Sequence, residues 1–134
     1  DQGASQAILL AKTPNRYLCG VLEVSLKQHF TDRTNWRKML KNEVLENVNL
    51  AEVKADLKPK IEDSFQEYLT DDEEVIDLVY PVEAYPEKVK SVGFDKLPEI
   101  KGRLQGIKGQ YLLLDENRVL NMRKHTGYHI KLSA

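Results

Sequence analysis

The apolar periodicity of this chain changes near residue 72, and that change limits the fold more than any other feature of the sequence. Two stretches before it, residues 14–30 and 49–69, have apolar residues every three or four positions, which is typical of amphipathic helices. After it, the apolar residues come in short runs separated by glycine, proline and acidic residues, which is typical of strands and turns. The sequence therefore predicts an α+β fold, with a helical region over residues 1–72 and a small basic β domain over residues 73–134.

The helical region is expected to open with a short buried strand over residues 6–12. Asn49 can cap the second helix, and Pro59 predicts either a kink or two helices that meet near Lys58. The β region is expected to form a small, mostly antiparallel barrel of the SH3 or OB type, or a bent sheet. Its candidate strands are residues 75–82, 88–94, 100–107, 109–115, 118–123 and 128–132, with a hairpin turn at residues 115–117.

Glu23 lies at the margin of the apolar stripe of the helix predicted at residues 14–30. An ionised carboxylate beside apolar side chains needs a cation, a hydrogen-bond donor or a metal ion. The residues leave two interpretations open. In one, Glu23 reaches water or pairs with Lys27, Arg33 or Arg37; in the other, it is a functional carboxylate that binds a cation.

A dense polar cluster follows, at the start of another helix that is expected to end near residue 42. Three residues are suitable N-caps for it: Thr31, Asp32 and Thr34. Arg33, Asn35 and Arg37 crowd near the same helix N-terminus, where backbone N–H groups and the helix dipole favour anions. The cluster is therefore either a phosphate site or a capping network.

Charge is distributed unevenly along the chain. Between residues 62 and 83 all charged side chains are acidic, whereas from residue 99 onward seven Lys and Arg occur with three acidic residues. A basic surface with aromatic rings suits nucleic acid, because cations hold phosphates and rings stack on bases. The candidate nucleic-acid-binding residues are Arg33, Arg37, Lys108, Arg123, Lys124, His125 and Tyr128. The alternative is a basic solubilising face with its tyrosines buried.

Composition excludes several other classes of protein. Charged residues at 31%, hydrophobic residues at 41% and a formal charge of −1 are ordinary for a globular chain and exclude a strongly basic one. A single cysteine, Cys19, excludes an internal disulfide and a cysteine-based zinc site, and we expect it to be a buried, inert thiol of a cytoplasmic protein. No membrane-spanning run, secretory signal or nucleophile–base pair is visible in the sequence.

Segments in both halves of the chain resemble those of a family of uncharacterised bacterial proteins that share a domain of unknown function. The segments are DQGASQA, LEVSLKQHF, DRTNWRKML and GIKGQYLLLDENRVLNMRKHTGY. Members of that family usually carry cysteine-rich, zinc-ribbon-like segments and a GIT…PTRW-like strand and helix upstream. The resemblance therefore implies that this chain is a fragment that lacks the upstream part.

The first half is, more distantly, similar to the later part of GIY-YIG nuclease domains. In those domains a helix glutamate binds the catalytic metal and an asparagine follows a loop later. The resemblance implies that Glu23 is a catalytic ligand for Mg²⁺ or Mn²⁺ and that Asn35 is a catalytic asparagine. The tyrosines and arginine of those domains would precede Asp1, so we expect this chain alone to be inactive.

Taken together, the residues and the resemblance predict a protein that binds DNA or RNA, has no membrane partner, and has a nuclease-like first half. The alternative is a non-catalytic module that binds another protein. The sequence contains features that suit either class.

Overall fold

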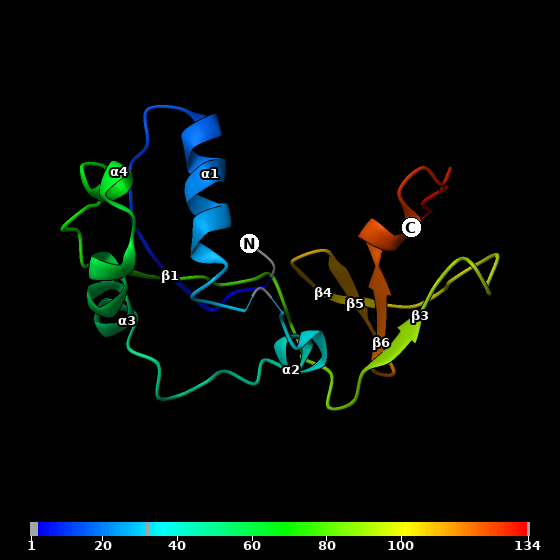
Figure 1. Ribbon diagram of the computed structural model, residues 1–134. Helices are drawn as coiled ribbons and strands as arrows, with labels where there is room; N and C mark the ends of the chain where they lie inside the picture. The colour runs from blue at the N-terminus through cyan, green and yellow to red at the C-terminus, as the bar shows by residue number, and fades with distance from the viewer. Residues whose placement is uncertain (1–2, 32, 134) are drawn as a thin grey trace. The chain divides into compact units, whose positions relative to one another are not determined.

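The computed structural model describes residues 3–31 and 33–133, which form two compact units (Figure 1). The helical unit comprises Ser5–Thr34 and Leu45–Leu78, and the sheet unit comprises Asp1–Ala4, Asn35–Val44 and Val79–Ala134. The described residues of the two units form four α-helices, a two-stranded sheet and a four-stranded sheet, which confirms the α+β prediction. No helix in the described part of the chain is long and apolar enough to cross a membrane.

The helical unit places three helices around one small apolar core. Its elements are β1 (Gln6–Ile8), α1 (Arg16–Leu26), α3 (Leu50–Leu57), the 3-10 turn η1 (Lys58–Lys60), α4 (Asp63–Gln66) and β2 (Val75–Asp77). β1 and β2 pair antiparallel, and both are shorter than the runs that the sequence predicted. The buried residues of the core are Leu22, Leu57, Ile61 and Phe65.

Local capping decides where α1 begins. The Oδ1 atom of Asn15 accepts a hydrogen bond from the Leu18 N–H at 2.9 Å, so the helix starts at Arg16 rather than at Pro14. It ends at Leu26, about one turn earlier than the apolar pattern indicated. The expectation that Cys19 is buried is wrong: its thiol is exposed, because the buried stripe of α1 is narrower than the sequence suggested.

The second long apolar stretch is broken where the sequence predicted. Asn49 caps α3, with its Oδ1 atom accepting from the N–H groups of Ala51 at 3.0 Å and Glu52 at 3.3 Å. The α3 helix ends at Leu57 because Pro59 has no N–H to donate and its ring clashes with the preceding turn. The chain then makes η1 and resumes as α4, so the stretch is two helices rather than one kinked helix.

A buried lysine ties α3 to both ends of the helical unit. The Lys54 side chain is 4% exposed, and its Nζ atom donates to the carbonyl oxygen of Leu9 at 2.7 Å and to Thr70 Oγ1 at 3.0 Å. It also donates to the carbonyl oxygen of Asp72. Three acceptors therefore satisfy the three N–H bonds of the ammonium group, which compensates for its removal from water.

The sheet unit is a four-stranded sheet covered by one short helix. Its elements are α2 (Trp36–Leu40), β3 (Lys90–Val92), β4 (Leu104–Lys108), β5 (Tyr111–Leu114), β6 (Arg118–Asn121) and the 3-10 turn η2 (Met122–His125). The strand order is β3-β6-β5-β4, with β3 parallel to β6 and the other pairs antiparallel. A register shift between Leu104 and Gly106 marks a bulge in β4, which bends the sheet.

The sheet stays open rather than closing into a barrel, with β3 and β4 at its edges. The predicted turn at residues 115–117 is confirmed, since Glu116 and Asn117 both have positive φ angles, 55° and 63°. The strand predicted at residues 128–132 does not form. Those residues are exposed and pair with no edge of the sheet, so their alternating pattern does not produce a strand.

The core of the sheet unit joins residues that are far apart in the sequence. Leu40 of α2 is fully buried against Tyr111, Leu113 and Val119. Residues 35–44 thus pack with strands that follow them by about 70 residues, a long loop closure. The division into domains at residue 72 stays a prediction, and these contacts place α2 with the later strands.

We expect Lys54→Met to lower the free energy of unfolding by about 2 kcal/mol or more, because it removes the hydrogen bonds by which a buried ammonium group joins α3 to Leu9, Thr70 and Asp72. The matched control is Lys58→Met, which removes an ion pair to the exposed Asp71 and is expected to cost less than about 1 kcal/mol. Urea unfolding followed by circular dichroism at the helix band measures both. A Lys54→Met variant as stable as Lys58→Met would contradict this account of the core.

Candidate nucleic-acid interface

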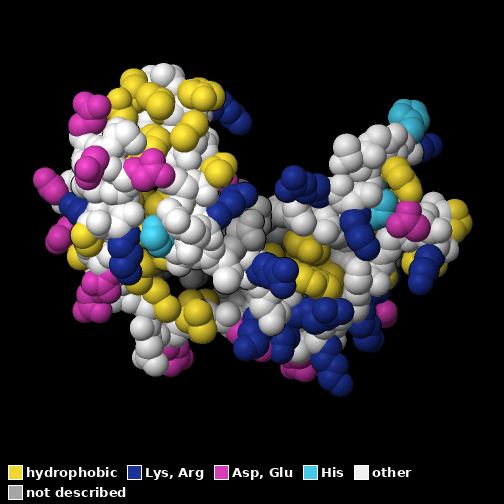
Figure 2. Space-filling model, in the orientation of Figure 1, with side chains coloured by type: hydrophobic (Ala, Val, Ile, Leu, Met, Phe, Trp, Pro, Cys, Tyr) yellow, Lys and Arg dark blue, Asp and Glu magenta, His cyan; other side chains and the backbone are white. Residues whose placement is uncertain are grey.

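Charge is segregated between the two units. The sheet unit carries thirteen Lys and Arg and eight Asp and Glu, a formal charge of +5, whereas the helical unit carries seven and thirteen, a formal charge of −6. The near-zero charge of the whole chain therefore hides two units of opposite sign. Figure 2 shows Lys and Arg side chains gathered on the visible face of the sheet unit.

Many cations of the sheet unit are exposed and unneutralised. Within residues 3–31 and 33–133, carboxylates form salt bridges with Lys41, Lys101, Arg103 and Arg118 of this unit. The exposed cations that have no such bridge there are Arg37, Lys38, Lys88, Lys90, Lys96, Arg123, Lys124 and Lys131. Their charges remain available to an anion in solution.

The predicted polar cluster becomes the capped start of α2. The Oδ1 atom of Asn35 accepts from the Lys38 N–H at 3.2 Å, so this amide acts as the N-cap. Of the three predicted caps, Thr31 and Thr34 precede the helix without capping it, and Asp32 lies outside the described residues. The capping interpretation of the cluster is therefore observed at Asn35.

A stack of planar groups stands on this helix. The ring of Trp36 lies parallel to that of Tyr111, with 5.9 Å between centroids and 3° between planes. The guanidinium carbon of Arg37 lies 4.2 Å from the Trp36 ring centroid, within cation–π range. Sequence reasoning missed this arrangement, although the only tryptophan of the chain directly precedes an arginine.

Lys108 is placed differently from the exposed cation that the sequence predicted. Its side chain is 2% exposed, and its Nζ atom donates to Asn42 Oδ1 at 3.0 Å. The same atom lies 5.3 Å and 5.1 Å from the ring centroids of Tyr80 and Tyr85. Burial lowers the pKa of the Lys108 ammonium from its usual value, because the charged form loses its water.

His125 is also buried, at 4% exposure, and both of its ring nitrogens are engaged. Its Nε2 atom accepts from the Phe94 N–H at 3.0 Å, so Nδ1 carries the proton that faces the carbonyl oxygen of Asn121 at 2.9 Å. The ring also makes edge contacts with Phe94 and Tyr128 at 5.2 Å. These contacts occupy the imidazole within the protein, so His125 supports the fold of this segment rather than offering a free ring.

The neighbouring candidates differ in how available they are. Tyr128 is half-exposed, and its hydroxyl donates a hydrogen bond to Asp95, which raises the pKa of Tyr128 because it holds the protonated form beside a carboxylate. Arg123 and Lys124 are exposed on η2, which Asn121 caps by accepting from the Lys124 N–H at 3.3 Å. Of this predicted group, the two cations of η2 are therefore the residues best placed to meet a phosphate.

The remaining predicted residues, Glu23 and Arg33, belong to the helical unit and are exposed. The described residues give the Glu23 carboxylate no hydrogen bond or ion pair, so the predicted pairing with Arg33 is not observed. Among them there is also no group of three or more His, Cys, Asp or Glu arranged to hold a metal ion. Any cation at Glu23 would therefore have at most one further His, Cys, Asp or Glu ligand among the described residues.

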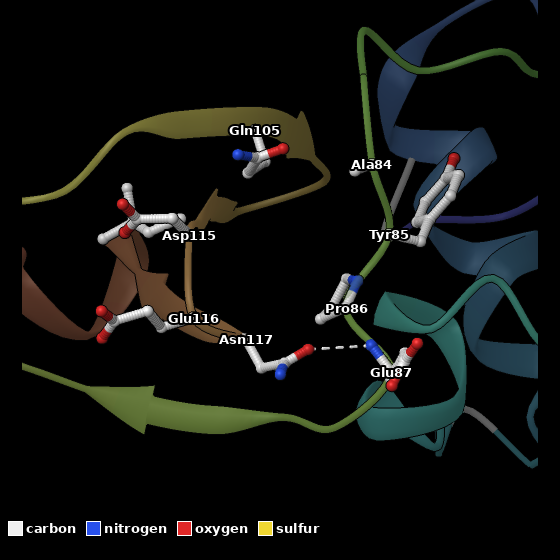
Figure 3. Close-up of a pocket in the computed structure, with 9 residues that line it drawn as sticks. Ala84, Tyr85, Pro86, Glu87, Gln105, Asp115, Glu116 and Asn117 are labelled. Atoms are coloured by element: carbon white, nitrogen blue, oxygen red, sulfur yellow. Dashed lines mark hydrogen bonds between the residues drawn. The ribbon is translucent and has the colours of Figure 1, made fainter.

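A shallow pocket of about 340 Å³ lies between the β5–β6 turn and the segment that precedes β3 (Figure 3). Asn117 closes one end, where its Oδ1 atom accepts from the Glu87 N–H at 2.9 Å. The Asp115 and Glu116 carboxylates point away from Tyr85 and Pro86 on the opposite wall. None of the predicted site residues lines this pocket.

We expect Lys108 to make stability depend on alkaline pH. Because its pKa is lowered in the folded protein, the unfolded chain binds more protons between that lowered value and 10.5, and stability rises with pH across this window. Lys108→Met removes this rise, whereas Lys101→Met, at a side chain 81% exposed, retains it. Thermal melts from pH 8 to 10.5 measure the difference, and parallel profiles for wild type and Lys108→Met would contradict the assignment.

Comparison with known proteins identifies the family of this chain. The family described as "Protein of unknown function (DUF2797)" matches residues 1–130. Searches of curated proteins and of solved structures found no match. Because the match covers nearly the whole sequence, the chain belongs to this family of proteins of unknown function (DUF2797).

Proposed function

We propose that this chain binds nucleic acid through its sheet unit. The observation that carries the proposal is the charge segregation: a unit of formal charge +5 with eight exposed, unbridged cations among its described residues. Nucleic acid is a dense array of phosphates, and each cation that neutralises one releases a condensed counterion. A surface of this kind therefore gains affinity for DNA or RNA without any base-specific contact.

Four of the eight exposed cations form two clusters of adjacent residues that can contact phosphates. Arg37 and Lys38 stand on α2, and Arg123 and Lys124 stand on η2. Both clusters belong to the sheet unit, so its core holds them in fixed positions. A fixed surface loses less conformational entropy on binding than a mobile basic tail does.

The alternative function is a module that binds another protein. An acidic protein surface would meet the same cations, and it would also show salt-dependent binding. Nucleic acid is the proposed partner because one of the exposed cations, Arg37, is stacked on Trp36, an arrangement that suits bases as well as phosphates.

We expect labelled single- and double-stranded DNA and RNA to bind, with affinity falling steeply as salt rises. Arg123→Ala combined with Lys124→Ala removes two phosphate contacts and should lower the salt slope for single strands by about 1.4. The matched control is Arg16→Ala with Lys60→Ala, two exposed cations of the helical unit, which should leave the slope unchanged. Fluorescence anisotropy titrations at several salt concentrations measure these slopes.

Binding that is absent, or equally affected by both double variants, would overturn the proposal. In the first case the protein-interaction module becomes the better explanation of the basic surface. In the second case the charge of the whole chain, rather than the sheet unit, controls the affinity.

A second proposal concerns Glu23 and follows from the distant GIY-YIG similarity of the first half. The Glu23 carboxylate is exposed and has no partner among the described residues, so a divalent cation can reach it. Mg²⁺ is commonly held by one or two carboxylates together with water and substrate phosphates, a donor set that Glu23 can join. The proposal does not extend to Asn35, whose amide oxygen is engaged as the cap of α2.

We expect Mg²⁺ or Mn²⁺ to raise the melting temperature of the wild-type protein in the presence of a nucleic-acid strand, and Glu23→Gln to lose that increment. At a free-ion concentration ten times the dissociation constant the stabilisation is about 1.4 kcal/mol. Glu46→Gln, at an exposed loop position, is the control. Equal shifts in all three proteins would assign the effect to ions bound by the strand.

A further inference from the structure

We propose that the stack formed by Tyr111, Trp36 and Arg37 is a base-stacking platform, and that it makes the sheet unit prefer single-stranded over double-stranded nucleic acid. This inference rests on the proposed function, because it names the class of nucleic acid that the same unit takes. It adds a site that binds the rings of the bases, whereas the exposed cations bind the phosphates.

The stack has an anchored base and an exposed end. Tyr111 lies in β5 and is 8% exposed, and Trp36 is partly buried against the same core. Arg37 is exposed, and its guanidinium carbon lies 4.2 Å from the indole centroid. The guanidinium over the indole is thus a planar cation that solvent can reach, and a nucleobase can stack on it.

The helix that carries the stack is held at both ends. At the start, Asn35 caps the first turn. At the end, Asn42 adopts a positive φ of 58°, the Glu43 N–H donates to the Lys38 carbonyl oxygen at 2.9 Å, and the buried Lys108 binds the Asn42 side chain. The indole is therefore positioned before any ligand arrives, which reduces the entropy lost on binding.

The preference for single strands follows from where the base faces lie. In a duplex each base is stacked between its neighbours, so a protein surface meets mainly phosphates, sugars and groove edges. A single strand exposes the faces of its bases, and every base has a face that can stack. Lys38, the next residue along α2, is exposed and can hold a phosphate of the same strand.

The sole tryptophan of the chain gives this site its own signal. We would follow Trp36 emission during titration with a twelve-nucleotide thymidine strand, a duplex of equal length and an abasic strand of equal length. The abasic strand keeps the phosphates and lacks the rings, so it separates stacking from charge. We expect the thymidine strand to quench Trp36 and to bind about tenfold more tightly than the abasic strand, which corresponds to about 1.4 kcal/mol.

The variants separate the planar group from its charge. Arg37→Lys keeps the charge and removes the planar guanidinium, so we expect it to lose the quenching and the tenfold preference while it keeps the salt slope. The control is Arg103→Ala, at an exposed arginine that pairs with Glu83 at 3.3 Å, and we expect it to retain both. Circular dichroism spectra verify that each variant is folded.

The outcomes distinguish this inference from the function on which it rests. Equal affinity for thymidine and abasic strands with unquenched Trp36 would overturn the platform and leave nucleic-acid binding intact. A duplex that binds as tightly as the thymidine strand would overturn the preference for single strands. Quenching that survives in Arg37→Lys would overturn the role of the guanidinium. Absence of binding to every strand would overturn both proposals.

Discussion

The burial of Leu40 against the sheet is the contact on which the rest of the sheet unit depends. Its side chain has no exposed surface and packs on Tyr111, Leu113 and Val119. Full burial of a leucine contributes about 1.5–3 kcal/mol, and this one also fixes the position of a helix of only five residues. Without that anchor a helix so short would not be stable by itself. The polar residues on α2 are thus held in place by an apolar one.

The two buried lysines show how differently one side chain can be accommodated. Lys54 has three oxygen acceptors for its three N–H bonds, so it acts as a hydrogen-bonding centre of the helical unit. Lys108 has one oxygen acceptor and two tyrosine rings, which attract its charge more weakly than water does. Its lowered pKa reflects that incomplete compensation. Through its hydrogen bond to Asn42, Lys108 also lies at the C-terminal end of α2, where the helix dipole favours a cation.

Local signals in the sequence predicted local structure well. Asn49 as a cap, Pro59 as a break and residues 115–117 as a turn are all confirmed, because each depends on a few neighbouring residues. The candidate site was harder to predict, because burial is decided by contacts distant in sequence. Lys108 and His125 read as surface residues of a basic region, yet partners 66 and 31 residues away enclose them. Composition alone could not reveal those partners.

The threading of the chain through its two units has a consequence for how the protein folds during synthesis. Residues 35–44 leave the ribosome between two stretches of the helical unit, but their apolar contacts wait for β5 and β6. Until those strands emerge, Trp36 and Leu40 remain uncovered. The helical unit, which ends at Leu78, has by then been synthesised completely. Closure over roughly 70 residues is slow compared with formation of a hairpin. The sheet unit is therefore expected to be the last part to form, and the nascent chain exposes the apolar side chains of residues 36–40 in the meantime.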